Sequence, residues 1–270
     1  MPRLAAVIGS PVRHSLSPAM HDAAFQAKGL DWRFTRFELV PGGVPAALAA
    51  MPVLDIGGYA VTTPHKEAAA RGVDDIDPVA RALSSVNTVV LRDDGSTFGT
   101  STDGIGLVAW VEASGVTITD RPVVVLGAGA AARSIVAALA GAGASDIAIV
   151  NRTVSAAERA AALSPVARVA GFDAVADARL VVNATSVGMG THDCPLDATL
   201  LHPGHAVADI VYHPLDTALL QAARAAGAQA LDGLGMLVHQ AVEQQRLWTG
   251  HRPDPSLMRS AAERALSAAR

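Results

Sequence analysis

The segment Pro122–Ala132, PVVVLGAGAAA, decides the fold of this 270-residue chain. Its apolar beginning, Pro122–Leu126, is typical of a strand that is covered on both faces of a parallel sheet. The rest matches G-x-G-x-x-A, a form of the fingerprint with which a strand–turn–helix unit binds a dinucleotide. Gly127 would make the tight turn, and Gly129 would let the backbone approach a pyrophosphate at the start of a helix over Ala130–Gly141.

Short apolar runs and helical stretches alternate on both sides of this segment. Further strands are expected at residues 4–8, 33–39, 58–62, 86–91, 147–150, 180–182 and 206–211. A helix with Ser17 as its N-cap should run to about Lys28, another should cover 217–227, and the last two should begin near Met236 and Pro255. This alternation predicts an α/β protein rather than a sandwich.

Composition narrows the class of protein. Apolar residues make up 50% of the chain, charged residues 17%, and the net charge is −4. No apolar run reaches the roughly 18 residues that span a bilayer, and the apolar N-terminal stretch is too short for a signal peptide. A weakly acidic chain lacks the basic surface of a nucleic-acid-binding protein. Because Cys194 is the single cysteine, a disulfide framework and a cysteine-based zinc site are excluded. We expect a cytoplasmic globular protein.

The residues after the second strand of the fingerprint unit indicate which dinucleotide binds. An NAD site usually has an acid there, whereas an arginine accommodates the 2′-phosphate of NADP. The chain has Asn151, Arg152 and Thr153 at this place and no acid. Arg152 can pair with a phosphate, and its two neighbours can hydrogen-bond it. We therefore expect NADP, with a solvated loop arginine as the alternative.

Two further places suggest a substrate site. Ser15 and Ser17, near a predicted helix start, could hold a carboxylate, although N-capping is the simpler explanation of Ser17 taken alone. Lys66 is one of only two lysines and lies at a strand-to-helix turn, while Asp103 lies at the predicted domain boundary near residues 103–108. In a cleft between domains such a pair could exchange protons with a substrate hydroxyl. An exposed surface lysine is the alternative.

Taken together, these motifs and several others closely resemble those of shikimate dehydrogenases. They occur in the family's order between residue 5 and about residue 250: Gly9–Pro11, His14–Pro18 with His21, Val61–Lys66, Val86–Thr88, Thr102–Gly104, Gly127–Gly129, Asn151–Thr153, Asn183–Met189 and Gly233–Gln240. The resemblance implies an α/β substrate-binding domain, residues 1–103 with 236–270. It also implies a Rossmann-type NADP-binding domain, residues 104–235, with the active-site cleft between the two domains.

The resemblance further implies a reaction, the reversible reduction of 3-dehydroshikimate to shikimate by NADPH. This is an oxidoreductase step (EC 1.1.1.25) of chorismate and aromatic amino-acid biosynthesis. Lys66 and Asp103 would be the catalytic pair, because a cation near the ring carbonyl stabilises the developing alkoxide and supplies its proton. No metal is expected, and His14, His21 and His65 would be structural, unless His65 tunes Lys66.

The remaining site residues follow from the same resemblance. Ser15 and Ser17 would bind the substrate carboxylate, with Tyr212 approaching it from the cofactor side, and Thr62, Asn87 and Gln240 would hold ring hydroxyls. The cofactor would meet Gly127, Ala128, Gly129, Ala130, Ala131, Asn151, Arg152, Thr153, Thr185, Ile210, Gly233 and Met236.

Three positions depart from the family's usual residues. Ala60 and Ser101 each stand where an asparagine is usual, and both changes are expected to have little effect. Ala156 stands where a second basic residue is usual, so that Arg152 alone would hold the 2′-phosphate and NAD use stays open. The alternatives are therefore a quinate/shikimate or aminoshikimate dehydrogenase that uses NAD, or a non-catalytic metabolite sensor. A sensor would be expected to lack Lys66 or Asp103. Either a monomer or a homodimer fits.

Overall fold

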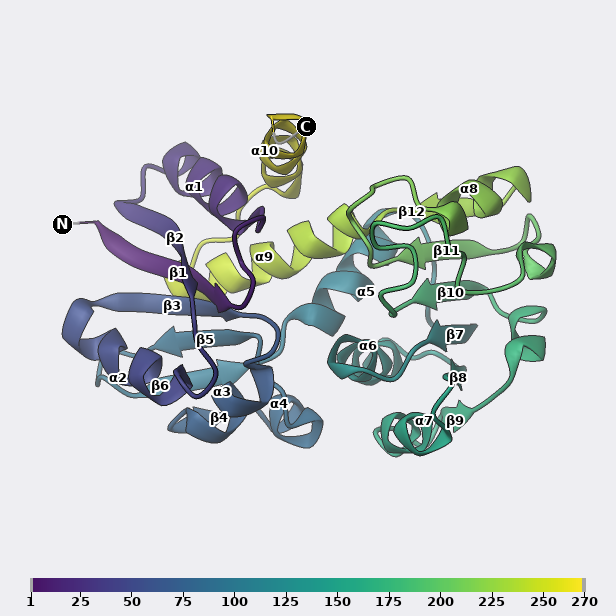
Figure 1. Ribbon diagram of the computed structural model, residues 1–270, viewed down its shortest axis with the longest axis horizontal. Helices are drawn as coiled ribbons and strands as arrows, with labels where there is room; N and C mark the ends of the chain where they lie inside the picture. The colour runs from purple at the N-terminus through teal and green to yellow at the C-terminus, as the bar shows by residue number, and fades with distance from the viewer. Residues whose placement is uncertain (1, 269–270) are drawn as a thin grey trace. The chain divides into compact units, whose positions relative to one another are not determined.

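The computed structural model describes residues 2–268 (Figure 1). It divides into two compact units, each built around a six-stranded sheet. The first unit contains the chain up to Thr102 and again from Val238 onward, and the second is Asp103–Leu237. The α/β architecture predicted from the sequence is confirmed. Within residues 2–268, no helix is long and apolar enough to cross a bilayer.

The sheet of the first unit is mixed. In sheet order its strands are β2 (Trp32–Glu38), β1 (Arg3–Gly9), β3 (Ile56–Val61), β5 (Thr88–Leu91), β6 (Thr97–Thr100) and β4 (Asp75–Ile76). Strand β1 is parallel to both of its neighbours, whereas β5 runs antiparallel to β3 and to β6. Strands β1, β3 and β6 therefore end at the edge of the sheet where β5 begins.

Helices cover both faces of this sheet. They are α1 (Ser17–Ala27), α2 (Val44–Leu54), α3 (Lys66–Gly72), α4 (Pro78–Leu83), the C-terminal part of α9 (Gly233–Thr249) and α10 (Pro255–Ala268). Side chains of α2, α3 and α4 share one apolar core with Tyr59 and Val61 of β3. Phe25 of α1 and Trp248 of α9 share the other core with Ala60. Helix α10 lies beside α1 (Figure 1).

The sheet of the second unit is entirely parallel. In sheet order its strands are β12 (Gln229–Leu231), β11 (Ala206–Asp209), β10 (Leu180–Asn183), β7 (Pro122–Leu126), β8 (Asp146–Val150) and β9 (Ala167–Val169). Numbered along the chain within the unit, this order is that of a doubly wound Rossmann sheet. It is the order that follows when the chain winds outward from a central first strand, β7, in both directions.

Helices and short 3-10 turns cover the two faces of this parallel sheet. They are α5 (Asp103–Ala113), α6 (Ala130–Gly141), α7 (Val154–Ala161), α8 (Ala218–Ala225) and the 3-10 turns Phe172–Val175 and Ala198–Leu200. Val123 and Val125 face a core shared with α5, α6 and α7, whereas Val124 and Leu126 face a core shared with α8. Strand β7 is therefore buried on both faces, which explains its unbroken apolar sequence.

Two predicted helix starts were wrong. Helix α1 has Leu16, not Ser17, at its N-cap, because Ser17 already belongs to the helix and its N–H donates to Oγ of Ser15, at 3.3 Å. Helix α9 begins at Gly233 rather than near Met236. Its glycines weaken the sequence signal for a helix. The Asp232 carboxylate compensates by accepting the N–H of Gly235, at 3.1 Å. Helix α2, which contains Pro52, was not predicted at all.

Candidate active site

The carboxyl edge of the first sheet collects most of the predicted substrate residues. Thr62 follows β3, Asn87 precedes β5, and Thr102 follows β6 by two residues. Backbone hydrogen bonds hold these ends together: Thr62 N–H donates to Ile8 O at 2.9 Å, and Asn87 N–H donates to Thr100 O at 3.1 Å. Hydroxyl and amide side chains from three strand ends thus share one edge.

Ser15 and Ser17 lie after β1 at the start of α1. Ser15 is half-buried and Ser17 is 5% exposed. Leu16, the N-cap residue, makes no side-chain cap bond, and the Ser15 hydroxyl accepts the N–H of Ser17 at 3.3 Å. The N-capping alternative for Ser17 is thereby excluded. Both hydroxyls lie next to a helix N-terminus, where backbone N–H groups and the helix dipole favour a negative charge.

A buried cluster of amides and hydroxyls occupies the same edge. The backbone N–H of Thr102 donates to Oδ1 of Asn87 at 2.7 Å, so the side-chain atom facing it must be the oxygen. The Nδ2 group of Asn87 then donates to Oγ1 of Thr102 at 3.1 Å and to Oε1 of Gln240 at 3.2 Å. Asn87 and Gln240, two predicted substrate residues 153 positions apart, are therefore in direct contact.

Lys66 is the first residue of α3. Its carbonyl accepts the N–H of Val86 at 3.1 Å, which fixes the start of the helix beside the strand end that carries Asn87. The preceding residue, His65, is buried and its Nε2 donates to Leu39 O at 2.9 Å. That bond supports a structural role for His65, which anchors the turn before Lys66.

The other two predicted structural histidines differ in burial. His14 is exposed, whereas His21 is fully buried and stacks on Phe34 with ring centroids 4.5 Å apart. Burial lowers the pKa of His21 to about 4, against the raising effect of hydrogen bonds from Gln245 and Gln244. Among residues 2–268, no three His, Cys, Asp or Glu side chains form a group that could hold a metal ion.

Asp103 opens α5 in the second unit and is 8% exposed. The next residue, Gly104, donates its N–H to Oγ of Ser134 in α6, at 2.9 Å. A Cβ at Gly104 would lie 2.1 Å from the Ser134 carbonyl oxygen, so a side chain cannot be accommodated there. This close packing of α5 against α6 fixes the position of Asp103 within the unit.

The turn after β7 has the features that a dinucleotide requires. Gly127 has φ 107°, in the region that favours glycine, and a Cβ there would lie 2.9 Å from Cγ2 of Thr185. A Cβ at Gly129 would meet nothing within 4 Å, and no side chain caps the N-terminus of α6. No capping side chain therefore competes with a pyrophosphate for the first N–H groups of α6.

The loop after β8 carries the predicted 2′-phosphate residues. Arg152 and Thr153 are exposed, and Nδ2 of Asn151 donates to Thr153 O at 2.9 Å. No acid occupies the strand end, and Ala156 lies in the first turn of α7 with no charge to add. The residues present fit a phosphate held mainly by one guanidinium.

The ends of β10 and β11 are joined by a second polar network. Nδ2 of Asn183 donates to Oδ1 of Asp209 at 2.9 Å, and Oδ1 of Asn183 accepts the Thr185 hydroxyl at 2.7 Å. Asp209 also accepts the Val211 N–H at 3.0 Å and the Thr217 hydroxyl at 2.7 Å. This network fixes the backbone around Thr185 and Ile210, two predicted cofactor residues.

Three more predicted residues lie near this network in the chain. A Cβ at Gly233 would lie 2.6 Å from the Ile210 carbonyl oxygen, so these two predicted cofactor residues are adjacent. Tyr212 is half-buried, and burial raises the pKa of its hydroxyl. Met236 is 8% exposed and packs into the apolar core beside α5 and α6.

The structure adds residues to which the motifs assigned no role. Asp209 and Thr217 complete the second network, and Thr88 and Gln244 extend the first. A signal for Gln244 existed in the sequence, because it lies four residues after Gln240 and so on the same face of a helix. Asn183 was part of a matched motif, but the spacing alone does not reveal that its partner is Asp209.

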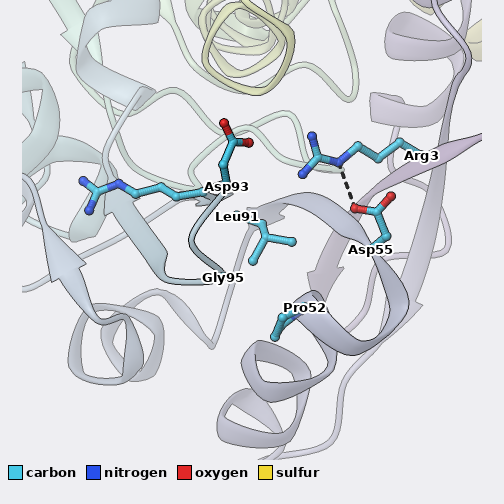
Figure 2. Close-up of a pocket in the computed structure, with 7 residues that line it drawn as sticks. Arg3, Pro52, Asp55, Leu91, Asp93 and Gly95 are labelled. Carbon is cyan, nitrogen blue, oxygen red and sulfur yellow. Dashed lines mark ion pairs between the residues drawn. The ribbon is translucent and has the colours of Figure 1, made fainter.

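A cavity of about 410 Å³ lies at the opposite edge of the first sheet, where β1 and β3 begin (Figure 2). It is lined by Arg3, Pro52, Asp55, Leu91, Arg92, Asp93 and Gly95. Arg3 Nε lies 3.2 Å from Oδ1 of Asp55, and Arg92 pairs with Asp75 at 2.7 Å. None of the predicted site residues lines this cavity, and its two arginines are balanced by two aspartates.

Family models match most of the chain. The shikimate dehydrogenase substrate-binding domain matches residues 7–89, and the shikimate/quinate 5-dehydrogenase model matches residues 111–186. The shikimate 5′-dehydrogenase C-terminal domain matches residues 233–263. The three models therefore follow one another along the chain in the order in which the motifs were recognised.

Individual proteins agree with these models. A shikimate dehydrogenase (NADP(+)) of Symbiobacterium thermophilum is 42% identical over 98% of this chain and 95% of its own. The structure is similar to that of shikimate 5-dehydrogenase from Thermus thermophilus in complex with NADP(H) and shikimate. That pair has a TM-score of 0.90 and 39% identity over 97% of this chain and 99% of the other.

A relative with another substrate is also similar. Quinate dehydrogenase from Corynebacterium glutamicum, in complex with NAD, has a TM-score of 0.90 and 33% identity over 96% of this chain and 98% of its own. The fold and its polar edges thus define a class, the two-domain dehydrogenases of cyclic hydroxy acids that use a nicotinamide dinucleotide. Within that class, the chain belongs to the shikimate dehydrogenase family.

Proposed function

We propose that this chain catalyses the reversible, NADPH-dependent reduction of 3-dehydroshikimate to shikimate. The observation that carries the proposal is the carboxyl edge of the first sheet. It presents hydroxyls, amides and Lys66 in a chain that also contains a dinucleotide-binding turn. A polyol acid needs such hydrogen-bonding partners, whereas an apolar substrate would need apolar side chains in their place.

In this proposal the substrate is held by the first unit. Ser15 and Ser17 bind its carboxylate, because two hydroxyls lie there beside a helix N-terminus whose N-cap residue, Leu16, makes no side-chain cap bond. Thr62, Asn87 and Gln240 bind ring hydroxyls. Gln240 turns Oε1 toward Nδ2 of Asn87, so its own Nε2 hydrogens are the groups it offers to a substrate oxygen. Tyr212 is the third residue that this proposal assigns to the carboxylate.

The cofactor is held by the second unit. The turn at Gly127–Gly129 and the first N–H groups of α6 bind the pyrophosphate, and Arg152, with Asn151 and Thr153, binds the 2′-phosphate. Thr185, Ile210, Gly233 and Met236 contact the nicotinamide half. When bound, NADPH supplies a hydride to the ring carbonyl carbon of the substrate.

The chain's own residues deal with the charge and the proton. Negative charge develops on the carbonyl oxygen of 3-dehydroshikimate, and the Lys66 ammonium stabilises it and donates the proton that completes the hydroxyl. Asp103 accepts a hydrogen bond from a substrate hydroxyl. In the reverse direction Lys66 accepts the proton.

The test is absorbance at 340 nm while the purified protein oxidises shikimate, with NADP and then with NAD, repeated with quinate. We expect rapid NADP-dependent oxidation of shikimate. Quinate oxidation with NAD would favour the second candidate, a quinate dehydrogenase, which is suggested by the absence of a second base at Ala156. Absence of turnover, with shikimate still bound, would indicate a metabolite sensor.

Two coarser properties belong to the same proposal. The single cysteine and the net charge of −4 agree with an enzyme that works in the cytoplasm on a small-molecule substrate. A monomer or a homodimer is compatible with this reaction, and sedimentation of the active protein distinguishes the two.

A further inference from the structure

Gln244 is a buried polar residue for which neither the motifs nor the proposed reaction has a use. It is 1% exposed and lies on α9 one turn beyond Gln240. Its Nε2 group donates to Oγ1 of Thr88 at 3.2 Å and approaches Asn87 O at 3.5 Å. Since a backbone carbonyl only accepts, the orientation of the Gln244 amide is determined: the nitrogen faces β5 and the oxygen faces away.

The Thr88 hydroxyl links the orientation of the Gln244 amide to that of the Asn87 amide. A hydroxyl has one hydrogen, and the Thr88 hydroxyl, which accepts from Gln244, donates its own to Oδ1 of Asn87 at 2.8 Å. Oδ1 of Asn87 also accepts the backbone N–H of Thr102 at 2.7 Å. The Thr88 hydroxyl and the Thr102 N–H therefore fix the position of Oδ1 of Asn87. Its Nδ2 group is then directed at Gln240 Oε1, at 3.2 Å.

The geometry points to Gln244 as a positioning residue for the substrate-binding amides: through Thr88 it orients Asn87, and through Asn87 it orients Gln240. The inference rests on the proposed function, because it assumes that Asn87 and Gln240 bind shikimate. Gln244 itself does not touch the substrate in this arrangement. The four side chains of Gln244, Thr88, Asn87 and Gln240 belong to the first unit and are at most 8% exposed, so their hydrogen bonds are largely shielded from solvent.

The neighbouring Gln245 provides a matched control. It is also fully buried on α9, but its Oε1 lies 3.2 Å from Nδ1 of His21, with which it forms a hydrogen bond. It makes no hydrogen bond to Thr88 or Asn87 within the described part of the chain. Gln244 also interacts with His21. Replacing Gln245 therefore tests the effect of losing a buried amide that contacts His21 from the same helix, without touching the amides of the substrate site.

The experiment compares Gln244→Met with Gln245→Met in the complete enzyme. We expect Gln244→Met to raise the KM for shikimate about 10-fold, the effect of losing one buried hydrogen bond on binding, with the KM for NADP within about 2-fold of the wild-type value. Gln245→Met should leave both KM values within about 2-fold. An unchanged shikimate KM in Gln244→Met would overturn the inference.

Two further measurements separate positioning from a general structural role. In an Asn87→Ala background, Gln244→Met should add less than about 2-fold to the shikimate KM, because both effects of Gln244 on the substrate-binding amides pass through Asn87. Full additivity would contradict the inference. Thr88→Val should reproduce the KM increase and Thr88→Ser should restore the wild-type value, and this pair also decides the matter if Gln244→Met does not fold.

The same assays keep the two proposals apart. A wild-type protein that does not oxidise shikimate overturns the proposed function, and the inference falls with it. A wild-type protein that oxidises shikimate, while Gln244→Met behaves as Gln245→Met does, overturns the inference alone.

Discussion

The carboxyl edges of the two sheets carry similar asparagines in different networks. Oδ1 of Asn87 accepts the N–H of Thr102 at 2.7 Å, and Oδ1 of Asn183 accepts the N–H of Thr185 at 3.1 Å. The amide hydrogens then go to different partners. Asn87 donates to the neutral Gln240, whereas Asn183 donates to the Asp209 carboxylate.

Under the proposed function, this difference separates a network that includes substrate-binding residues from one that is closed. Gln240 accepts from Asn87, and in the proposed function its Nε2 group donates to a substrate oxygen. Asp209 accepts from Asn183, Val211 and Thr217, all within its own unit, so its oxygens are used by the fold. The neutral network does not change charge with pH, while the closed network contains a buried ionisable group.

The largest effect is expected when the closed network loses its centre. Asp209→Leu leaves three buried donors without an acceptor, and at about 1–3 kcal/mol each the free energy of unfolding should fall by about 4 kcal/mol. Asp209→Asn is the matched control. It keeps Oδ1, and the Thr217 hydroxyl can accept from the new amide, so its loss should be about 1 kcal/mol or less. Urea unfolding at pH 7 measures both, and equal losses would show that the hydrogen bonds of Asp209 do not carry its contribution.

The two Asp209 variants also test the charge. Burial raises the pKa of Asp209, and the hydrogen bonds from Thr217, Val211 and Asn183 offset this only in part. A raised pKa means that the folded state gives up this proton less readily than the unfolded chain. Stability from this group is therefore lost as pH rises through its folded pKa. Asp209→Asn lacks the group, so its stability relative to wild type should improve as pH rises from about 4 toward neutrality.

The second prediction concerns the pH dependence of stability at His21, which is buried beside Gln245 of α9. The pKa of this imidazole is lowered from 6.5 to about 4 by burial, so the unfolded chain binds the proton first. The contribution of neutral His21 to the free energy of unfolding is fully present above pH 6.5. It should fall by on the order of 3 kcal/mol as pH decreases toward 4. In His21→Phe this dependence should be absent. The readout is the difference between the two proteins in urea-unfolding stability from pH 7 to pH 5, where a parallel decline in both would contradict the assignment.

The third prediction concerns chemistry at the first edge. Lys66→Ala should lower kcat at least about 10²-fold, equivalent to about 2.7 kcal/mol, because the general acid is lost. The KM for NADP should change little. Lys28, the other lysine, is exposed at the end of α1, and Lys28→Ala should leave kcat unchanged. Turnover of Lys66→Ala at the wild-type rate would remove this residue from the mechanism.

The smallest effect is expected at the second edge, where Arg152 is proposed to bind the 2′-phosphate of NADP. Arg152→Ala should raise the KM for NADP about 10-fold, through the loss of one charge-assisted pair, and leave the KM for NAD nearly unchanged. Arg159→Ala, at an exposed position on α7, is the control. Equal increases for both cofactors would mean that Arg152 does not recognise the 2′-phosphate.

The sequence by itself determined the α/β class, the fingerprint turn and the set of residues expected to bind. Strand β7 was read correctly because a strand buried on both faces must be apolar throughout, and Gly127 because its positive φ demands glycine. Both properties depend on a few consecutive residues, so the sequence of a short segment is enough to predict them. Helix α2 was not predicted because Pro52, near its end, is unfavourable in a helix. Burial of Leu48 and Met51 against the sheet stabilises this helix in the folded protein.

The tertiary structure alone decided how the polar residues are connected. Asn87 meets Gln240 across 153 positions and Thr88 meets Gln244 across 156, so no spacing in the sequence could reveal either pair. The same holds for Asn183 and Asp209, on neighbouring strands. A buried polar group must find a partner wherever the fold places one, and only the fold determines which amide faces another amide and which faces a carboxylate.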